Sequence, residues 1–271
     1  MTITGGIKVF EKSDCLFKDG AEAVASSATD SANYMLSMNK YLRWDSIGSD
    51  DTTSEDITIT FDSTTFSRLF LVSHNLKEFT ITYGAGSTAF TNVVGIDGTK
   101  SGITETVFSE NTSYYEFDAV TTTQINISAL KTQVADDEKY ITLVAVTTEM
   151  GTFEGYPQVT PMTDANEKRA QVQTGKYITQ KSFETFNAKI SQEHTSQEDI
   201  DLLNTMYERQ QPFLLWLCGG KYGTANFSVE FKNWRLQDLY QVQTYGPVET
   251  RFRSNVYTSS PMTAIQLAEE V

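Results

Sequence analysis

The chain has 271 residues, of which 39% are hydrophobic, 21% charged and 12% aromatic, a composition typical of a folded protein. Its formal net charge is −14 and it has no basic run, so we expect no direct nucleic-acid binding. Neither a membrane-spanning apolar stretch of roughly 20 residues nor a secretory signal at Met1–Phe10 is recognisable. Cys15 and Cys218 lie far apart, which favours free buried thiols in a protein that folds in a cytoplasm.

The first half of the chain predicts a run of short β-strands. Asp56–Phe61 alternates apolar and polar residues with a period of two, which predicts a half-buried strand. Arg68–Ser73 is a denser apolar run, which predicts a strand buried on both faces. Strands at this spacing indicate an antiparallel sandwich rather than alternating strands and helices. The further strands expected are Phe79–Tyr83, Tyr114–Phe117, Thr123–Ser128 and Lys139–Thr147.

The periodicity is lost over Gly151–Asp164, a segment that holds two of the five prolines. We therefore place a domain boundary there, with one domain over residues 1–150 and a second over residues 151–271. The alternative is a long loop within one larger sandwich. The strands expected in the second half are Ala170–Ile178, Ser182–Ile190, Phe213–Cys218, Phe227–Phe231, Leu239–Gln243 and Arg251–Tyr257.

One helix is expected in the second half, at about residues 196–210. Thr195–Glu198 reads as a capping box, and Asp199 adds negative charge to the first turn. Pro212 ends the helix. The fold class is therefore mainly β: an N-terminal jelly-roll β-sandwich, then a C-terminal β-sandwich or α+β domain with one flanking helix. The apolar stripe of the helix is formed by Ile200, Leu203, Met206 and Tyr207.

The sequence offers little evidence of enzymatic chemistry. Neither His74 nor His194 has a neighbour at metal-ligand spacing, and motifs for a nucleophile elbow, a zinc site or a phosphate loop are missing. We therefore expect no enzyme, catalytic residue, metal or cofactor. A Ser-His pair, or two acids converging in a cleft, would favour a hydrolase instead. The acidic loop Ser49–Asp51, with Glu55 and Asp56, could offer oxygen ligands to calcium, but a solvated turn is the simpler interpretation.

Arg43 and Trp44 stand just before the first strand of alternating apolar residues. On this pattern, residues 30–150 resemble the galactose-binding-like, discoidin-type jelly rolls. The resemblance implies a sandwich whose end loops can bind glycans or lipids, but it assigns no glycan-binding residue. The residues themselves favour Trp44 packed under the sheet with Arg43 paired nearby. Exposed Trp or Tyr at loop tips would favour a carbohydrate site, and the positions to inspect are Tyr83, Phe90 and Tyr114.

In the second half, the helix is followed by the apolar strand Phe213–Cys218, by Gly219-Gly220, and by the polar-aromatic segment Asn233–Tyr240. In this element order, residues 165–260 resemble the tail-tube-like domains of tailed bacteriophages, in particular distal tail and other tail-tip ring proteins. The resemblance implies rings in which sheets join between neighbouring subunits.

We therefore expect a structural component of a phage tail tip or baseplate, located in the virion tail and assembled in the host cytoplasm. Its second domain would form a homo-oligomeric ring, and its jelly roll would lie outside. The expected partners are copies of itself, other tail proteins and host surface glycans, with no membrane insertion. The alternative is a carbohydrate-binding module for host-receptor recognition that forms no ring.

Overall fold

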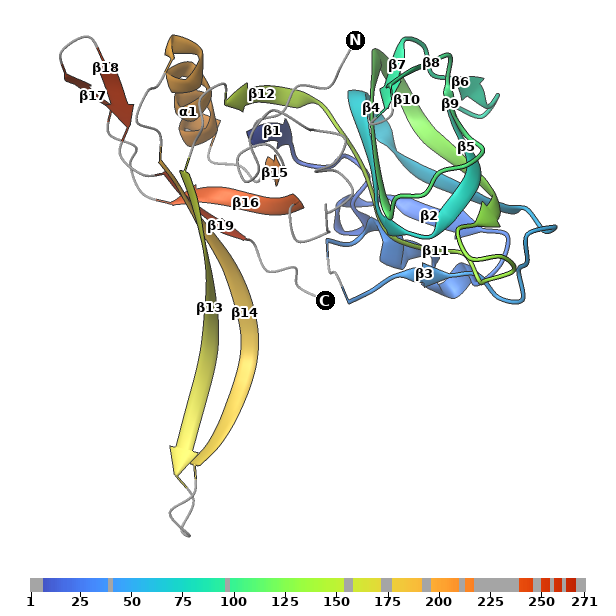
Figure 1. Ribbon diagram of the computed structural model, residues 1–271, viewed down its shortest axis with the longest axis horizontal. Helices are drawn as coiled ribbons and strands as arrows, with labels where there is room; N and C mark the ends of the chain where they lie inside the picture. The colour runs from blue at the N-terminus through green and yellow to red at the C-terminus, as the bar shows by residue number, and fades with distance from the viewer. Residues whose placement is uncertain are drawn as a thin grey trace.

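Figure 1 shows the computed structural model of the chain, which contains two β-rich units joined side by side. From residue 154 onward, side chains are described only in parts of the helix and of one short strand; elsewhere there the backbone alone is described. The described residues are 7–38, 41–95, 98–153, 158–171, 177–191, 196–209, 213–216, 239–245, 250–253, 256–259 and 262–266.

The N-terminal unit is a ten-stranded antiparallel sheet that curves around a core (Figure 1). Its two long strands, β4 (Glu55–His74) and β10 (Thr112–Thr132), pair with each other and shift register twice, which lets them bend around the core. β11 (Tyr140–Thr147) pairs with the other edge of β4, and β5 (Leu76–Tyr83) with the other edge of β10. The remaining elements are β2 (Glu22–Ala25), β3 (Trp44–Asp45), β6 (Thr88–Ala89), β7 (Val93–Gly95), β8 (Gly98–Lys100), β9 (Ile103–Glu105), and the 3-10 helices η1 (Phe17–Asp19) and η2 (Thr29–Leu36).

The burial pattern of β4 confirms both predictions made for it, although the two expected strands are one continuous strand. Ile57 and Ile59 are buried in the core of the N-terminal unit, as the alternation predicted. Further along, Leu71 belongs to that core, whereas Phe70 belongs to a second buried cluster on the opposite face. The dense apolar run is therefore buried on both faces because a second unit covers its outer side.

The second unit is built on a seven-stranded sheet whose last two strands in spatial order form a long hairpin. One helix, α1 (Gln197–Arg209), packs against the sheet's first strand, where a Cβ added at Gly151 would lie 3.0 Å from a methyl carbon of Leu202. The mainly β fold class is confirmed. In spatial order the strands are β12 (Glu149–Phe153), β1 (Ile7–Glu11), β15 (Phe213–Trp216), β16 (Leu239–Tyr245), β19 (Met262–Gln266), β14 (Tyr177–Ser191) and β13 (Gln158–Gln171), and β17 (Thr250–Arg253) pairs separately with β18 (Val256–Ser259).

The strands β13 and β14 form a hairpin that projects away from both units (Figure 1). The segment Gly151–Asp164, in which the sequence loses its periodicity, nevertheless contains strand residues: 151–153 belong to β12 and 158–164 to β13. Pro161 argues against a strand in the sequence, because proline cannot donate a backbone hydrogen bond and usually interrupts a sheet. It is accommodated here because β13 is the outermost strand and needs partners on one side only. The expected strand 170–178 is divided between β13 and β14, with residues 172–176 outside the described part.

The helix begins one residue later than the predicted capping box implies. The Ser196 hydroxyl accepts a hydrogen bond from the Asp199 N–H at 3.1 Å, and the Asp199 carboxylate accepts one from the Ser196 N–H at 3.3 Å. The capping pair is therefore Ser196 and Asp199, not Thr195 and Glu198; a short Asp side chain closes the box in place of Glu. The stripe is buried at Ile200, Leu203 and Met206, while the side chain of Tyr207 lies outside the described part.

The two sheets do not follow the order of the chain. Strand β1, from the extreme N-terminal part, lies between β12 and β15 in the second sheet. The boundary placed between residues 150 and 151 falls inside β12. The division of the chain into domains 1–150 and 151–271 stays a prediction. The expected strand 227–231 lies outside the described residues, as do residues 217–218 of the expected strand 213–218. The expected strand 251–257 is divided between β17 and β18, with residues 254–255 outside the described part.

Candidate functional site

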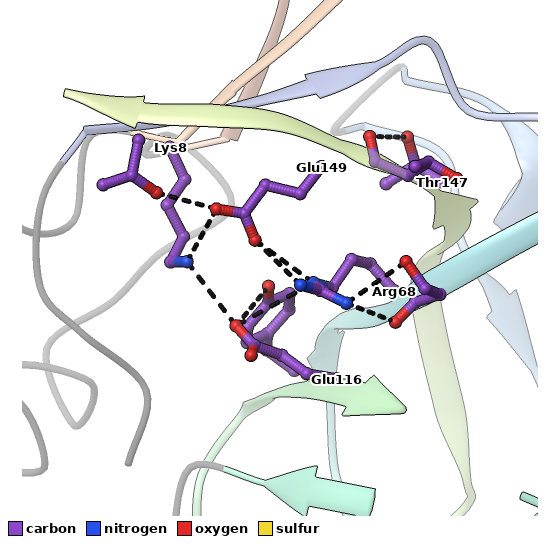
Figure 2. A network of polar contacts seen from close by, with 9 residues as sticks. Lys8, Arg68, Glu116, Thr147 and Glu149 are labelled. Atoms are coloured by element: carbon purple, nitrogen blue, oxygen red, sulfur yellow. Dashed lines mark hydrogen bonds and ion pairs between the residues drawn. The ribbon is translucent and has the colours of Figure 1, made fainter. Parts of the chain in front are cut away.

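A half-buried network of four charged residues lies where the two units meet (Figure 2). The ammonium of Lys8 on β1 lies 3.1 Å from Glu149 and 3.5 Å from Glu116. The Arg68 guanidinium on β4 donates to Glu149 through two nitrogens, at 3.0 and 3.2 Å. Two hydroxyls complete the network, because Tyr114 donates to Glu116 and Thr152 donates to Glu149. Two positive and two negative charges are thereby balanced at the contact between the sheets.

An aromatic cluster lies beside this network and closes the same contact. The ring of Phe10 on β1 packs edge-on against Phe70 on β4, with centroids 5.1 Å apart. Trp216 on β15 packs against Phe70 at 5.7 Å and against Tyr114 on β10 at 4.8 Å. All four side chains are fully buried, so this cluster joins β4 and β10 of the first unit to β1 and β15 of the second unit in one apolar core.

Glu116 and Glu149 are two acids that share the cations Lys8 and Arg68, and the surroundings of Glu149 do not suit the general acid of glycoside hydrolysis. Burial raises the pKa of the Glu149 carboxyl, yet the charges and hydrogen bonds of Lys8, Thr152 and Arg68 outweigh burial and bring that pKa below its ordinary value. A general acid must hold a proton near neutral pH, which requires a raised pKa. The geometry therefore makes these acids partners of two cations and not an acid–base pair.

His74 and Ser113 form the only Ser-His contact among the described residues, with Nε2 and Oγ 3.4 Å apart. The Leu76 N–H donates to Nδ1 of His74, so in the neutral ring the proton is on Nε2. An Nε2–H can donate to the serine hydroxyl but cannot accept its proton, as a general base would. Both residues are fully buried, and His74 stacks on Phe108. The pair is therefore part of the core, and His194 lies outside the described residues.

The acidic loop is organised by an ammonium from the chain itself. Lys139, which is fully buried, donates from Nζ to the Ser49 hydroxyl and to the Asp50 carbonyl oxygen. Hydrogen bonds from Thr52 and Thr53 lower the pKa of the Asp50 carboxyl to about 2. Within the described part of the chain, no group of three or more His, Cys, Asp or Glu residues is placed to hold a metal ion.

The Asp51 carboxylate accepts hydrogen bonds from the backbone and hydroxyl of Thr132, which ties the acidic loop to the end of β10. The simpler interpretation of this loop as a turn before a strand describes its geometry better than a calcium loop. Glu55 of the expected ligand set is buried and accepts a hydrogen bond from the Ser26 hydroxyl, and Asp56 starts the strand β4.

Trp44 and Arg43 lie as their residue types suggested. The Trp44 ring is fully buried and its indole N–H donates to the Ser27 carbonyl. Arg43 pairs with Asp45 at 2.7 Å and its guanidinium lies 4.5 Å from the centre of the Tyr140 ring. Tyr41, two residues earlier, is 80% exposed. Aromatic and charged side chains therefore gather at this end of the first unit.

Of the three aromatic positions inspected for a carbohydrate site, two are not exposed. Phe90 and Tyr114 are fully buried, so neither can present a ring face to a ligand. Tyr83 is partly buried and packs against Phe90 with centroids 5.0 Å apart. A polar hollow of about 260 Å³ elsewhere on this unit is lined by hydroxyls that bond one another, Thr80 with Thr104 among them.

Four of the residues that join the two units could not be recognised as such from the sequence: Lys8, Phe10, Glu149 and Trp216. The only local signal for β1 is the alternation in Ile7–Glu11, which is too short to distinguish a strand from a loop. Cys15 is a free, buried thiol, and burial raises its pKa to about 11; Cys218 lies outside the described residues. Among the described helices, none is both long and apolar enough to cross a membrane.

No protein-family model matches the chain, and no curated protein matches its sequence. Solved structures are similar to about half of it. They include a selenomethionine-labelled variant of chitosan-binding module 1 from a chitosanase/glucanase of Paenibacillus sp. IK-5, 18% identical over 51% of this chain and 98% of that one, with a TM-score of 0.40.

Two further similar structures are carbohydrate-binding modules with a sugar bound. Chitosan-binding module 2 of the same Paenibacillus enzyme, in complex with chitotriose, is 15% identical over 49% of this chain and 97% of that one, with a TM-score of 0.38. A family 32 module of C. perfringens NanJ, in complex with galactose, is 15% identical over 52% of this chain and 98% of that one, with a TM-score of 0.37. Likeness at this level assigns no ligand, and both the galactose-binding-like and the phage tail-tip resemblances stay predictions.

Proposed function

We propose that this protein is a structural component that assembles with copies of itself through its second unit. The observation that carries the proposal is the projecting hairpin of β13 and β14 (Figure 1). Among the described residues, the two strands pair only with each other over most of their length, because β14 meets β19 at Asn187–Ile190 alone. The first unit would then lie outside the assembly, where it can contact other proteins.

A hairpin of this length has a physical reason to seek a partner. Two strands alone bury little surface, and an isolated two-stranded hairpin is marginally stable in water. Its outer strand β13 also presents backbone groups along an edge, which is a template for pairing with another chain. The open sheet begins at β12 and ends at β13, so its two edges differ. Contacts between unlike edges of successive copies close into a ring when the rotation between the copies permits it.

The resemblance to phage tail-tip proteins provides a setting for such a ring, namely the tip or baseplate of a virion tail with other tail proteins as neighbours. The experiment is light scattering of the full chain across a concentration series, alone and with candidate tail proteins. The test variant replaces residues 164–185 by Asn-Gly, a turn suited to a two-residue hairpin, because Thr163 and Phe186 on either side are already paired. The control variant is Val107→Ser, a change at an exposed side chain of the first unit.

We expect the full chain and the control to form one defined oligomer. The shortened variant should stay monomeric, and its circular dichroism spectrum should show that the first unit is still folded. A full chain that stays monomeric in every mixture, or a shortened variant that assembles equally well, would contradict the proposal.

Glycan recognition is the second candidate function, and it is favoured by the exposed Tyr41, two residues before Arg43, whose guanidinium lies over the Tyr140 ring. Sugar sites combine an aromatic surface with a few polar groups. A glycan array that includes galactosides and chitosan oligosaccharides tests this function on the full chain. Tyr41→Ala should abolish any binding found there, while Val24→Thr, at another exposed apolar side chain, should leave it unchanged. Binding that survives Tyr41→Ala would move the site elsewhere.

A further inference from the structure

The strand β1 lies in a groove whose two walls come from distant parts of the chain. On one side Lys8 and Val9 pair with Thr152 and Gly151 of β12, and on the other side with Trp216 and Leu215 of β15. Both pairings are antiparallel, so β12 and β15 without β1 would face each other with unpaired edges. The groove is therefore shaped for one extended strand.

Side chains two residues apart point to the same face of a strand, and in β1 the two that face the first unit are Lys8 and Phe10. Each enters a pocket of matching chemistry. Lys8 lies between the carboxylates of Glu116 and Glu149 and is only 3% exposed to solvent.

Phe10 enters the second pocket, which is lined by Phe70, Tyr114 and Trp216 with centroids 5.1, 6.1 and 6.4 Å from its own. In strand addition, backbone hydrogen bonds supply affinity and alternate side-chain pockets supply specificity. The groove has both components.

We propose that the groove between β12 and β15 is a strand-binding site that recognises an extended peptide with Lys and Phe two residues apart, and that β1 is its ligand in the same chain. The inference is independent of the projecting hairpin, which lies at the other end of the second sheet. The N-terminal strand then acts as a latch between the two units: when it leaves, the groove can accept the same motif from another chain.

The first unit does not depend on β1 for the pairing of its own strands, whereas the departure of β1 would leave the facing edges of β12 and β15 unpaired. The last residue of β1 is bonded to the end of β11, because the Glu11 N–H donates to the Thr148 carbonyl and the Thr147 hydroxyl donates to the Glu11 carbonyl. Beyond the strand, the Asp14 N–H donates to the Val146 carbonyl and the Cys15 thiol to the Val144 carbonyl. The sheet of the first unit, from β2 to β11, contains no residue of β1.

The first experiment is hydrogen exchange on the intact chain. We expect the amides of Val9 and Phe10 to exchange at least tenfold faster than the paired amides of β4 and β10, because the latch opens while the first unit stays folded. Equal protection in β1 and in β4 would mean that β1 leaves only on global unfolding, and the proposal would be wrong.

The second experiment tests recognition. A protease site is inserted between Lys12 and Ser13, the folded chain is cut, and a labelled peptide of residues 5–12 is added in excess. We expect the labelled peptide to replace the cut strand, and unlabelled competitors with Lys8→Glu or Phe10→Ala to compete at least tenfold more weakly than the unaltered peptide. Equal competition by the altered peptides, or no entry of the labelled peptide while the first unit keeps its near-ultraviolet circular dichroism, would overturn the proposal.

The variant in which Asn-Gly replaces residues 164–185 separates this inference from the proposed function. Loss of the oligomer with unchanged peptide exchange would leave the strand-binding site standing. Loss of peptide recognition in a chain that still assembles would remove the strand-binding site alone.

Discussion

The ammonium of Lys8 lies 3.1 Å from a carboxylate oxygen of Glu149, although 141 positions separate the two residues in the sequence. This ion pair connects the strand before the first unit with the strand that follows it. Arg68 reaches the same carboxylate from within the first unit, at 3.0 Å. Both units therefore contribute to one network, and the stability of the contact between them can be measured at single residues.

Lys8→Met should destabilise the chain by about 3 kcal/mol, because removing one partner of a buried pair leaves the other charge uncompensated. The figure is at the low end of the usual range because the side chains of Glu116 and Glu149 are about one-fifth exposed. Lys12→Met is the matched control: Lys12 pairs with Asp19 at the same distance, 3.1 Å, but on the surface. It should cost less than about 1 kcal/mol. Urea unfolding compares the two variants, and equal losses would contradict the buried network.

Phe10→Ala should cost about 3–5 kcal/mol, the usual loss for a buried aromatic side chain whose cavity cannot collapse. The surrounding rings of Phe70, Tyr114 and Trp216 are all fully buried, so little can move into the space. Phe10→Leu should cost clearly less because it keeps most of the apolar volume. The measurement is again urea unfolding, monitored by tryptophan fluorescence. A loss below about 1 kcal/mol for Phe10→Ala would show that β1 contributes little to the core.

The parts of the fold that could be predicted are those where one segment carries its own signal. Residues 56–61 alternate strictly, and their strand lies where expected because one face meets the core and the other meets solvent. The helix was predictable because its apolar stripe and its capping residues are local. Even there the cap was placed one residue early, since Thr195 and Ser196 are equally good capping residues by type.

The contact between the units could not be predicted, because its energy comes from residues far apart in the chain. Nothing near Lys8 in the sequence announces Glu116 or Glu149 as its partners. The apolar run at residues 69–72 did indicate burial on both faces, but not that a second unit supplies the cover. For His74 the sequence leaves a Ser-His pair open without naming the serine, and the structure was needed both to place Ser113 beside the ring and, through the hydrogen bond from the Leu76 N–H to Nδ1, to identify the tautomer.

Ser196→Ala should destabilise the chain by about 1 kcal/mol, because the alanine cannot accept the hydrogen bond that the hydroxyl takes from the Asp199 N–H. Thr195→Ala is the control that separates the two candidate caps, and it should change stability by less than about 0.5 kcal/mol. Thermal unfolding followed at 222 nm measures both variants. The opposite order of losses would return the cap to Thr195.

His74 should make the stability of the chain depend on pH in mildly acidic solution. Burial lowers its pKa to about 3, whereas in the unfolded chain the ring titrates near its ordinary value of about 6.5. Between these two values the unfolded state binds a proton that the folded state does not. The free energy of unfolding therefore falls as the pH falls below about 6.5, by at most about 1.4 kcal/mol per pH unit, and the contribution is constant above that range.

The variant His74→Gln removes this titration while it keeps a side chain that can donate and accept hydrogen bonds. Gln packs differently against Phe79 and Phe108, so the variant has a stability offset of its own and the comparison is of slopes. We expect the free energy of unfolding of the original chain, minus that of the variant, to decrease by about 2 kcal/mol from pH 7 to pH 5. The carboxyl groups titrate in both chains and cancel in that difference. Parallel pH profiles would mean that the His74 ring takes up a proton in the folded chain as readily as in the unfolded one.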